Sequence, residues 1–110
     1  MGKIKLIKRG GTKEFLDMDE LCNLYVKNPV ITFGTSRLEP GKEGGIDPGH
    51  KLGEEIFFVA YGTVTCTFSK ETITMKEGDA VVIPLQEPHK LKNVGKVPAM
   101  VCWALAPSDP

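Results

Sequence analysis

The sequence predicts an all-β fold, either a sandwich or a barrel, and three observations lead to this prediction. Apolar and β-branched residues come in about eight to ten short runs, which have the length of strands. Glycine, proline and asparagine separate these runs at nearly regular spacing, and no stretch keeps the period of a long helix. The chain has 110 residues, the size of one domain. We therefore expect a single domain over residues 1–110, with N-terminal strands or a packing segment at 1–29 and the barrel at 30–106.

The N-terminal part is the least regular. Residues 3–8 alternate charged and apolar side chains, which predicts an edge strand whose lysines discourage further pairing. Residues 12–25 fit two structures: a one-sided helix, or a strand followed by a turn at 17–20 and a second strand at 21–27. In both cases the segment packs against the barrel and carries no chemistry.

The remaining strands are bounded by clear turn residues, beginning with Asn28-Pro29. We expect the segment 42–53, which is rich in glycine, to be a loop. The C-terminal tail, APSDP, is expected to be frayed. The expected strands are Val30–Leu38, Glu54–Tyr61, Thr63–Phe68, Ile73–Met75, Ala80–Ile83, His89–Asn93 and Ala99–Leu105.

The strand at 54–61 has a polar start and two apolar faces. Adjacent strand residues point to opposite faces, so Glu55 should point into the barrel and Glu54 away from it. Ile56 and Phe58 lie on the outer side, and an outer side this apolar is normally covered. A second copy of the chain or the N-terminal segment would cover it, and we expect a homodimer.

The chain contains two histidines, His50 and His89, each beside a predicted turn, with the carboxylate pair Glu54 and Glu55 between them in sequence. Imidazole nitrogens and carboxylate oxygens from neighbouring strands can converge on one divalent ion. Two histidines and one carboxylate leave open positions for water or a substrate. In isolation, however, a histidine is more often a surface or hydrogen-bonded residue than a ligand, so these residue types alone only allow a metal site.

The stretch 78–93, GDAVVIPLQEPHKLKN, resembles the second motif of the cupin family. That motif reads Gly, five residues, Pro, one residue, Gly, two residues, His, three residues, Asn. Gly78, Pro84, His89 and Asn93 match its spacing, and Gln86 replaces the second glycine.

The stretch 45–62, GIDPGHKLGEEIFFVAYG, resembles the first cupin motif. That motif reads Gly, five residues, His-x-His, three or four residues, Glu, six residues, Gly. Glu55 and Gly62 match its second half, and the string EEIFFVAYG is typical of cupin domains. The resemblance covers residues 40–93, about half of the chain.

The first half of this motif has only one histidine, and two alignments are open. If four residues separate the second histidine from Glu55, His50 is that second histidine and Pro48 stands at the first position. If the loop is one residue shorter, His50 is the first histidine and Leu52 replaces the second. Either way the resemblance implies three metal ligands, His50, Glu55 and His89, instead of four. Asp47 is a candidate substitute, although its offset differs from the motif.

The resemblance implies a jelly-roll barrel, also called a double-stranded β-helix, and a metal-binding protein that acts on or binds a small molecule. Cupins include dioxygenases, decarboxylases and isomerases, so the fold selects no reaction. Mn, Fe, Ni, Cu or Zn would each suit a histidine and carboxylate site. The alternative is a binding module for a sugar or an organic acid that holds metal weakly or not at all. Whether the protein is an enzyme stays open.

Other side chains are weaker candidates for the pocket. Gln86 lies near His89 and Arg37 lies on the strand that enters the loop, so either is a candidate contact for a ligand. Tyr61 is expected at the rim. Trp103 is expected in the core or at an interface.

Charge and composition exclude several functional classes. The chain has 14 basic and 14 acidic residues, whereas a nucleic-acid-binding face needs a basic excess. Its apolar runs are far too short for a membrane span, and MGKIKLIKRGG lacks the apolar core of a secretory signal. Cys22, Cys66 and Cys102 form no Cys-x-x-Cys pair, which favours reduced, buried thiols in a cytoplasmic protein. A single catalytic thiol is the alternative.

Overall fold

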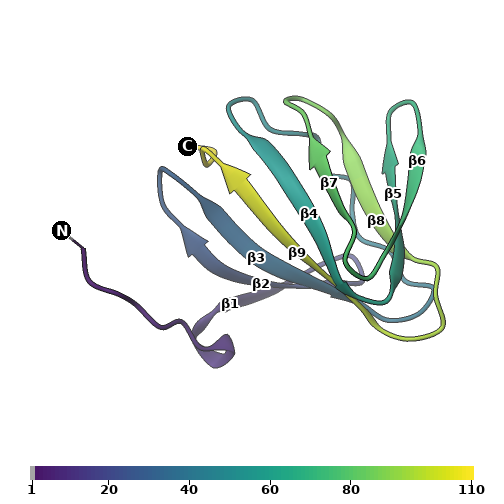
Figure 1. Ribbon diagram of the computed structural model, residues 1–110, viewed down its shortest axis with the longest axis horizontal. Coiled ribbons are helices and arrows are strands. Elements are labelled where there is room, and N and C mark those ends of the chain that lie inside the picture. The colour runs from purple at the N-terminus through teal and green to yellow at the C-terminus, as the bar shows by residue number, and fades with distance from the viewer. Residues whose placement is uncertain (1) are drawn as a thin grey trace.

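The computed structural model describes residues 2–110 and consists of nine strands in two sheets (Figure 1). The larger sheet has six strands in the order β1-β2-β3-β9-β4-β7, and the smaller has three in the order β6-β5-β8. The prediction of an all-β jelly-roll fold is confirmed. The strands are β1 (Lys13–Asp17), β2 (Glu20–Lys27), β3 (Thr32–Leu38), β4 (Glu54–Tyr61), β5 (Thr63–Phe68), β6 (Thr72–Lys76), β7 (Ala80–Ile83), β8 (His89–Asn93) and β9 (Ala99–Ala106).

The core lies between the two sheets. Strand β4 alternates between exposed and buried residues, and Val59 is completely buried. Strand β5 faces it with Val64 and Cys66, both also completely buried. Inward residues of both sheets form one apolar cluster, so the sheets are held together by the hydrophobic effect.

The two alternatives for residues 12–25 resolve into a hairpin. Strands β1 and β2 are antiparallel, with Asp17 paired to Glu20 across a tight turn. Met18 in this turn has a φ of 54°. The pairing extends the six-stranded sheet to its edge at β1 and places the start of β2 beside the loop that carries His50.

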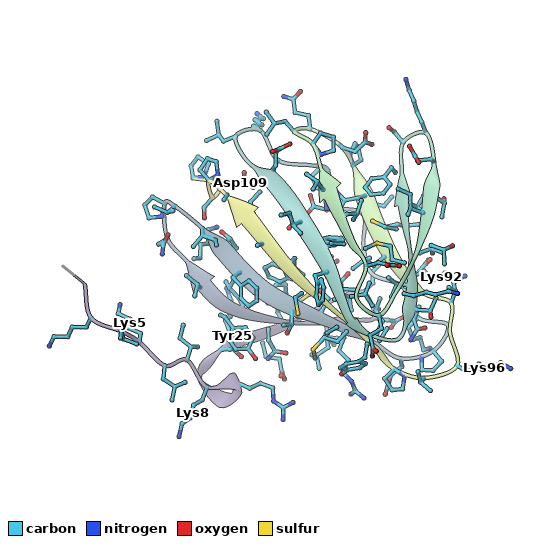
Figure 2. The ribbon with its side chains drawn as sticks, in the orientation of Figure 1. Lys5, Lys8, Tyr25, Lys92, Lys96 and Asp109 are labelled. Atoms are coloured by element: carbon cyan, nitrogen blue, oxygen red, sulfur yellow. The ribbon has the colours of Figure 1, made fainter. Side chains whose placement is uncertain are left out.

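The expected edge strand at residues 3–8 is wrong. This segment has no regular structure, and a short 3₁₀ helix, Arg9–Gly11, follows it. Figure 2 shows Lys5 and Lys8 on a segment that runs away from the sheets. Ile4 is 103 % exposed and Leu6 83 % exposed, because no strand lies beside the segment to pair with it.

The expectation of a frayed C-terminal tail is also wrong. Ser108 is buried, and its Oγ lies 2.7 Å from Oγ1 of Thr32. Its backbone N–H donates to the carbonyl oxygen of Pro29. These contacts fix the residues after β9 against the start of β3, which is how Asp109 comes close to His50.

The outer side of β4 is open in a single copy of the chain. Ile56 and Phe58 are 45 % and 44 % exposed, whereas Glu55, which points to the opposite face of the same strand, is 6 % exposed. The alternation predicted from the sequence is therefore confirmed.

No helix within residues 2–110 is long and apolar enough to span a membrane.

The side chain of Asn93 connects the end of β8 to neighbouring segments by hydrogen bonds. We therefore expect Asn93→Ala to destabilise the fold strongly. The side chain is completely buried. Its amide donates to the carbonyls of Leu38 (2.9 Å) and Val97 (2.8 Å), and its Oδ1 accepts from the N–H of Gly95 (2.8 Å). Loss of the amide leaves buried partners unsatisfied, which costs about 3 kcal/mol of unfolding free energy.

The measurement is urea unfolding, with Lys92→Ala as the control because Lys92 lies on the same strand and is exposed. Equal unfolding midpoints for the two variants would contradict the role given to Asn93.

Candidate metal centre

The loop between β3 and β4 lies against β8 and so brings Asp47 next to His89. The backbone N–H of Asp47 donates to the carbonyl of His89 (2.8 Å), and the N–H of His89 donates to the carbonyl of Asp47 (2.9 Å). The N–H of Gly49 donates to Oδ1 of Asp47 (2.8 Å), so Oδ2 is left facing the two imidazoles. Asp47, the candidate substitute with the unusual offset, therefore lies in the site.

Gly49 allows His50 to enter the site. Its φ is 99°, a conformation that other L-residues rarely adopt, and a Cβ there would lie 2.8 Å from the carbonyl carbon of Gln86. This close approach lets the N–H of Gln86 donate to the carbonyl of His50 (2.7 Å). The loop can therefore turn tightly against the β7–β8 connection, with the His50 ring pointing inward.

Glu55 and His89 come from opposite sheets. Glu55 is on β4 and is 6 % exposed, as the strand alternation requires. His89 is the first residue of β8, opposite Phe68 of β5, and is 3 % exposed. The site therefore spans the space between the sheets at one end of the barrel.

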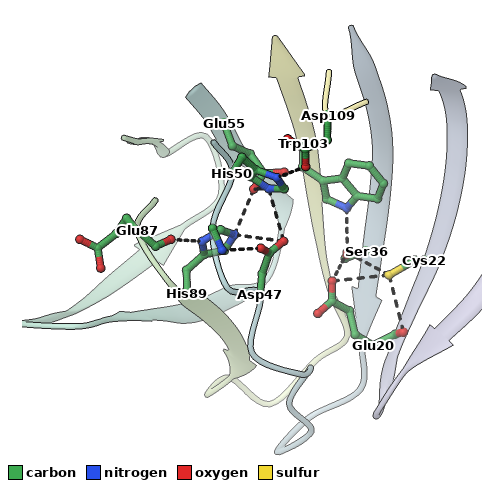
Figure 3. Close-up of polar contacts among 11 residues, drawn as sticks. Glu20, Cys22, Ser36, Asp47, His50, Glu55, Glu87, His89, Trp103 and Asp109 are labelled. Carbon is green, nitrogen blue, oxygen red and sulfur yellow. Dashed lines mark hydrogen bonds and ion pairs between the residues drawn. The ribbon is translucent and has the colours of Figure 1, made fainter. Parts of the chain in front are cut away.

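Four potential ligand atoms converge there: Oδ2 of Asp47, Nε2 of His50, Oε1 of Glu55 and Nε2 of His89 (Figure 3). The ligand atoms of the four residues all lie within 4.8 Å of one another. Nε2 of His50 is 3.3 Å from Glu55 and 3.4 Å from Asp47. Nε2 of His89 is 3.0 Å from Glu55 and 3.6 Å from Asp47. The three residues predicted from the sequence are thus brought together, with Asp47 as a fourth.

In both histidines, the other ring nitrogen, Nδ1, makes a hydrogen bond to a group outside the four potential ligand residues. Nδ1 of His50 is 2.6 Å from Oδ2 of Asp109, and Nδ1 of His89 is 2.8 Å from the backbone carbonyl of Glu87. Carboxylate and carbonyl oxygens only accept, so both Nδ1 atoms are the donors. In the neutral rings, Nε2 then carries the free lone pair, which is the arrangement of metal-binding histidines.

His89 shows that the residues fit a cation. Its Nε2 is buried and has no hydrogen-bond partner among residues 2–110. The 3.0 Å contact with Glu55 is short, but it is not aligned as a ring N–H hydrogen bond. An unpaired buried polar atom costs about 1–3 kcal/mol. A divalent ion at the centre of two nitrogens and two oxygens would remove that cost, and this donor set suits Mn, Fe, Ni, Cu or Zn.

The same groups attract protons when no metal is present. Burial by itself lowers the pKa of His50, but the hydrogen bond to Asp109 and the charges of Asp47 and Glu55 raise this pKa above its ordinary value. Burial also lowers the pKa of His89, and the contacts with Glu55, the Glu87 carbonyl and Asp47 outweigh it, so the net pKa is raised. A metal ion must therefore compete with protons for both rings.

The weaker sequence candidates separate into those inside and those outside the site. Arg37 points outward and lies 3.8 Å from Glu39, and the side chain of Gln86 is exposed. Tyr61 is at the other end of β4 from Glu55 and is 37 % exposed. Neither Arg37 nor Gln86 reaches the pocket, because strand parity and the loop turn direct their side chains outward.

Trp103 lies both against the core and on the pocket wall. It packs against the apolar cluster and lines a cavity of about 240 Å³ that also contains the four ligand residues. Its indole N–H donates to Oγ of Ser36 (2.8 Å). Phe57, Leu105 and Phe15 add apolar surface to the same cavity.

The cysteines are free thiols, as expected. Cys22 and Cys66 are buried, whereas Cys102 is partly exposed. Burial raises the pKa of Cys22 and of Cys66 to about 12, so neither thiol ionises readily. These environments disfavour a thiolate nucleophile at Cys22 or Cys66.

Sequence reasoning missed Asp109 and gave Asp47 little weight. Asp109 lies in a tail that was expected to fray, and no local pattern marks it as a partner of His50, 59 residues away in sequence. Asp47 has a signal, since an Asp-Pro-Gly turn directly precedes His50. An aspartate in such a turn is held close to the next few residues.

Comparisons with known proteins agree with the fold. A predicted oxalate decarboxylase from Thermotoga maritima is 16 % identical, with a TM-score of 0.79 over 94 % of this chain and 100 % of that one. KdgF from Halomonas sp. is 15 % identical, with a TM-score of 0.80 over 97 % of this chain and 96 % of that one. At these identities the likeness shows the fold alone.

Sequence comparison goes further. An uncharacterized protein of Methanocaldococcus jannaschii, MJ1618, is 36 % identical over 59 residues, which cover 53 % of this chain and 47 % of that protein. The chain thus matches about half the length of this curated relative. The family described as "Cupin domain" matches residues 34–105, a range that begins within β3 and ends within β9. The chain belongs to the cupin family.

Proposed function

We propose that the protein binds one divalent transition-metal ion through His50, Glu55 and His89, with Asp47 as the fourth ligand, and acts on or binds a small molecule beside it. The observation that carries the proposal is the unpaired, buried Nε2 of His89, which faces two carboxylates and a second imidazole. When bound there, a divalent ion supplies Lewis-acid polarisation of a ligand oxygen.

The side chains around the centre hold it in one geometry. Asp109 and the Glu87 carbonyl each fix one imidazole through Nδ1, and Gly49 fixes Asp47 through Oδ1. Phe57 packs edge-on against His89, with ring centroids 5.3 Å apart. These contacts reduce the reorganisation that binding a metal would require.

The likeness to the predicted oxalate decarboxylase supports a small-molecule ligand, without selecting a reaction. The alternative of a metal-free binding module is less well supported, because Asp47 supplies the fourth donor that the first motif lacks.

We further propose that a second copy of the chain covers Ile56 and Phe58 on the outer side of β4. The free thiols fit a reducing, cytoplasmic location, which we also propose.

Direct metal titration tests the proposal. Protein freed of metal with a chelator is titrated with Mn²⁺, Fe²⁺, Ni²⁺, Cu²⁺ and Zn²⁺ by calorimetry, and metal content is measured after dialysis. We expect one ion per chain and affinities that rise from Mn²⁺ to Cu²⁺. Absence of stoichiometric binding for all five ions would leave the metal-free binding module as the better description.

Substitution of Asp109, which contacts a proposed ligand but is not itself one, tests the metal site through a smaller change in affinity. We expect Asp109→Ala to weaken metal binding about 10- to 100-fold, the usual effect of removing a group that orients a metal-binding histidine. Glu54→Ala is the matched control, because Glu54 is an exposed carboxylate next to Glu55 that points away from the site. Equal affinities for the two variants would show that Asp109 does not orient His50.

A further inference from the structure

A second polar cluster, formed by Glu20, Cys22, Ser36 and Trp103, lies in the part of the cavity away from the four ligand residues (Figure 3). Oε2 of Glu20 accepts from the hydroxyl of Ser36 and is 3.6 Å from Sγ of Cys22. Ser36 also accepts from the indole N–H of Trp103 (2.8 Å). The four residues come from β2, β3 and β9, so three strands fix the direction of the Glu20 carboxyl group.

The other oxygen of this carboxyl group, Oε1, has no hydrogen-bond partner among the described residues 2–110. It lies where a side chain at Gly44 would be, so the absence of a side chain at residue 44 makes room for it. Glu20 lines the cavity, so an oxygen of this group without a protein partner is available to a ligand there. No part of the proposed metal site uses it.

The charges around the cavity disfavour an anionic ligand. A divalent ion would be balanced by Asp47 and Glu55 alone, which leaves Asp109 as an additional negative charge at the metal end. No arginine lines the cavity in the part of the chain that the structure describes. Lys90 lies 3.6 Å from Glu43, and Lys27 is exposed to solvent, which screens its charge.

A cationic ligand is disfavoured as well. The metal ion itself would repel a cation at one end of the cavity. At the other end, burial raises the pKa of Glu20, so this carboxyl group is protonated more easily than an ordinary glutamate. A neutral carboxyl group both donates and accepts, which is what hydroxyl groups need.

We propose that the cavity takes a neutral, hydroxyl-rich molecule of sugar size, and that Glu20 selects it by hydrogen bonding to hydroxyl groups that lie away from the metal. The cavity volume of about 240 Å³ fits a small metabolite. The apolar surfaces of Trp103, Phe57 and Leu105 can cover the C–H faces of such a molecule. This inference rests on the proposed metal site, but its test separates the two.

The test compares a neutral sugar with its uronic acid, which has a carboxylate at C6, and with its amino sugar, which has an amino group at C2. Glucose, glucuronate and glucosamine, and the corresponding galactose series, are titrated into the metal-loaded protein. We expect at least one neutral sugar to bind, and to bind about 10-fold or more tightly than its acid and its amine. Tighter binding of a uronate, tighter binding of an amino sugar, or no binding by either neutral sugar would each overturn the inference.

Two substitutions at one position test the role of Glu20. Glu20→Met keeps the approximate size and removes all hydrogen bonding, so we expect about a 10-fold loss of affinity for the neutral sugar. Glu20→Gln keeps a donor and an acceptor and should stay within a few-fold of wild type. Glu39→Gln, at an exposed carboxylate, is the control. Equal sugar affinities for Glu20→Met and wild type would remove Glu20 from the ligand site.

Metal titration of the same variants distinguishes this inference from the proposed function. Glu20 is not among the four ligand residues, so Glu20→Met should bind one metal ion as wild type does. If wild type binds no metal, the proposed function fails, and sugar titration of the metal-free protein still tests the preference for a neutral ligand.

Discussion

His89→Ala is expected to lower metal affinity by about 1000-fold or more, because it removes one of the four proposed ligands, the one whose buried Nε2 has no hydrogen-bond partner among residues 2–110. Removing a group that only orients a ligand already costs about 10- to 100-fold. His89 is 3 % exposed, and its Nε2 lies 3.0 Å from Glu55 and 3.6 Å from Asp47. No other histidine besides His50 exists in the chain to replace it.

The measurement is calorimetric titration with Ni²⁺ or Zn²⁺, together with metal content after dialysis. Because His89 is buried, the fold of the variant is checked by circular dichroism, and His89→Gln serves as a second, less disruptive variant. Lys90→Ala, the next residue on β8, is the control. Unchanged metal content in both His89 variants would remove this residue from the site.

Metal affinity is expected to fall steeply as the pH is lowered, by up to about 100-fold per pH unit once both histidines are protonated. Each ring must lose a proton before its nitrogen can bind a metal. The pKa of each histidine is raised in the folded, metal-free protein, by Asp109 and Asp47 at His50 and by Glu55 at His89. The loss of affinity should therefore begin above about 6.5, the ordinary histidine pKa.

The stability of the metal-free protein should show the opposite trend. A raised pKa means that protonation favours the folded state, so this contribution is complete below about pH 6.5 and disappears as the pH rises through the folded-state value. Metal-free protein should thus unfold at a higher temperature near pH 6 than near pH 8, and metal-saturated protein should not.

Thermal unfolding across this pH range checks the prediction, with the double variant His50→Gln/His89→Gln as the reference that removes contributions from other groups. A metal affinity that stays constant from pH 8 to pH 5.5 would argue against histidine ligands. If the metal-free wild type and the metal-free double variant unfold at the same temperature at pH 6, protonated imidazoles paired with carboxylates do not stabilise the fold.

Local patterns predicted the strands well. The bounds of β4, β5, β7 and β8 agree with those expected from alternation and turn residues, because these strands pack in the barrel with one side facing the core. The direction of Glu55 followed from the same alternation. At the N-terminus the alternation of residues 3–8 was misleading, since a strand needs a neighbour and this segment has none.

The site was predicted only in part, for a physical reason. His50, Glu55 and His89 could be identified because each has a marked position in a motif. Asp109 reaches His50 through a docked tail, which no local pattern encodes. Asp47 has a local signal in its Asp-Pro-Gly turn, but its place in the site also depends on a two-bond pairing with β8. Whether the three predicted residues bind a metal stays a prediction.

The docking of the last residues has a practical consequence for anyone who produces this protein. Asp109 lies 2.6 Å from His50, whereas the N-terminal segment runs away from the sheets (Figure 1). A polyhistidine purification handle attached after Pro110 would hold extra imidazoles a few residues from the pocket, where they would compete for the ion and pull on the tail. The same handle placed before Gly2 would extend into solvent and leave the titrations interpretable.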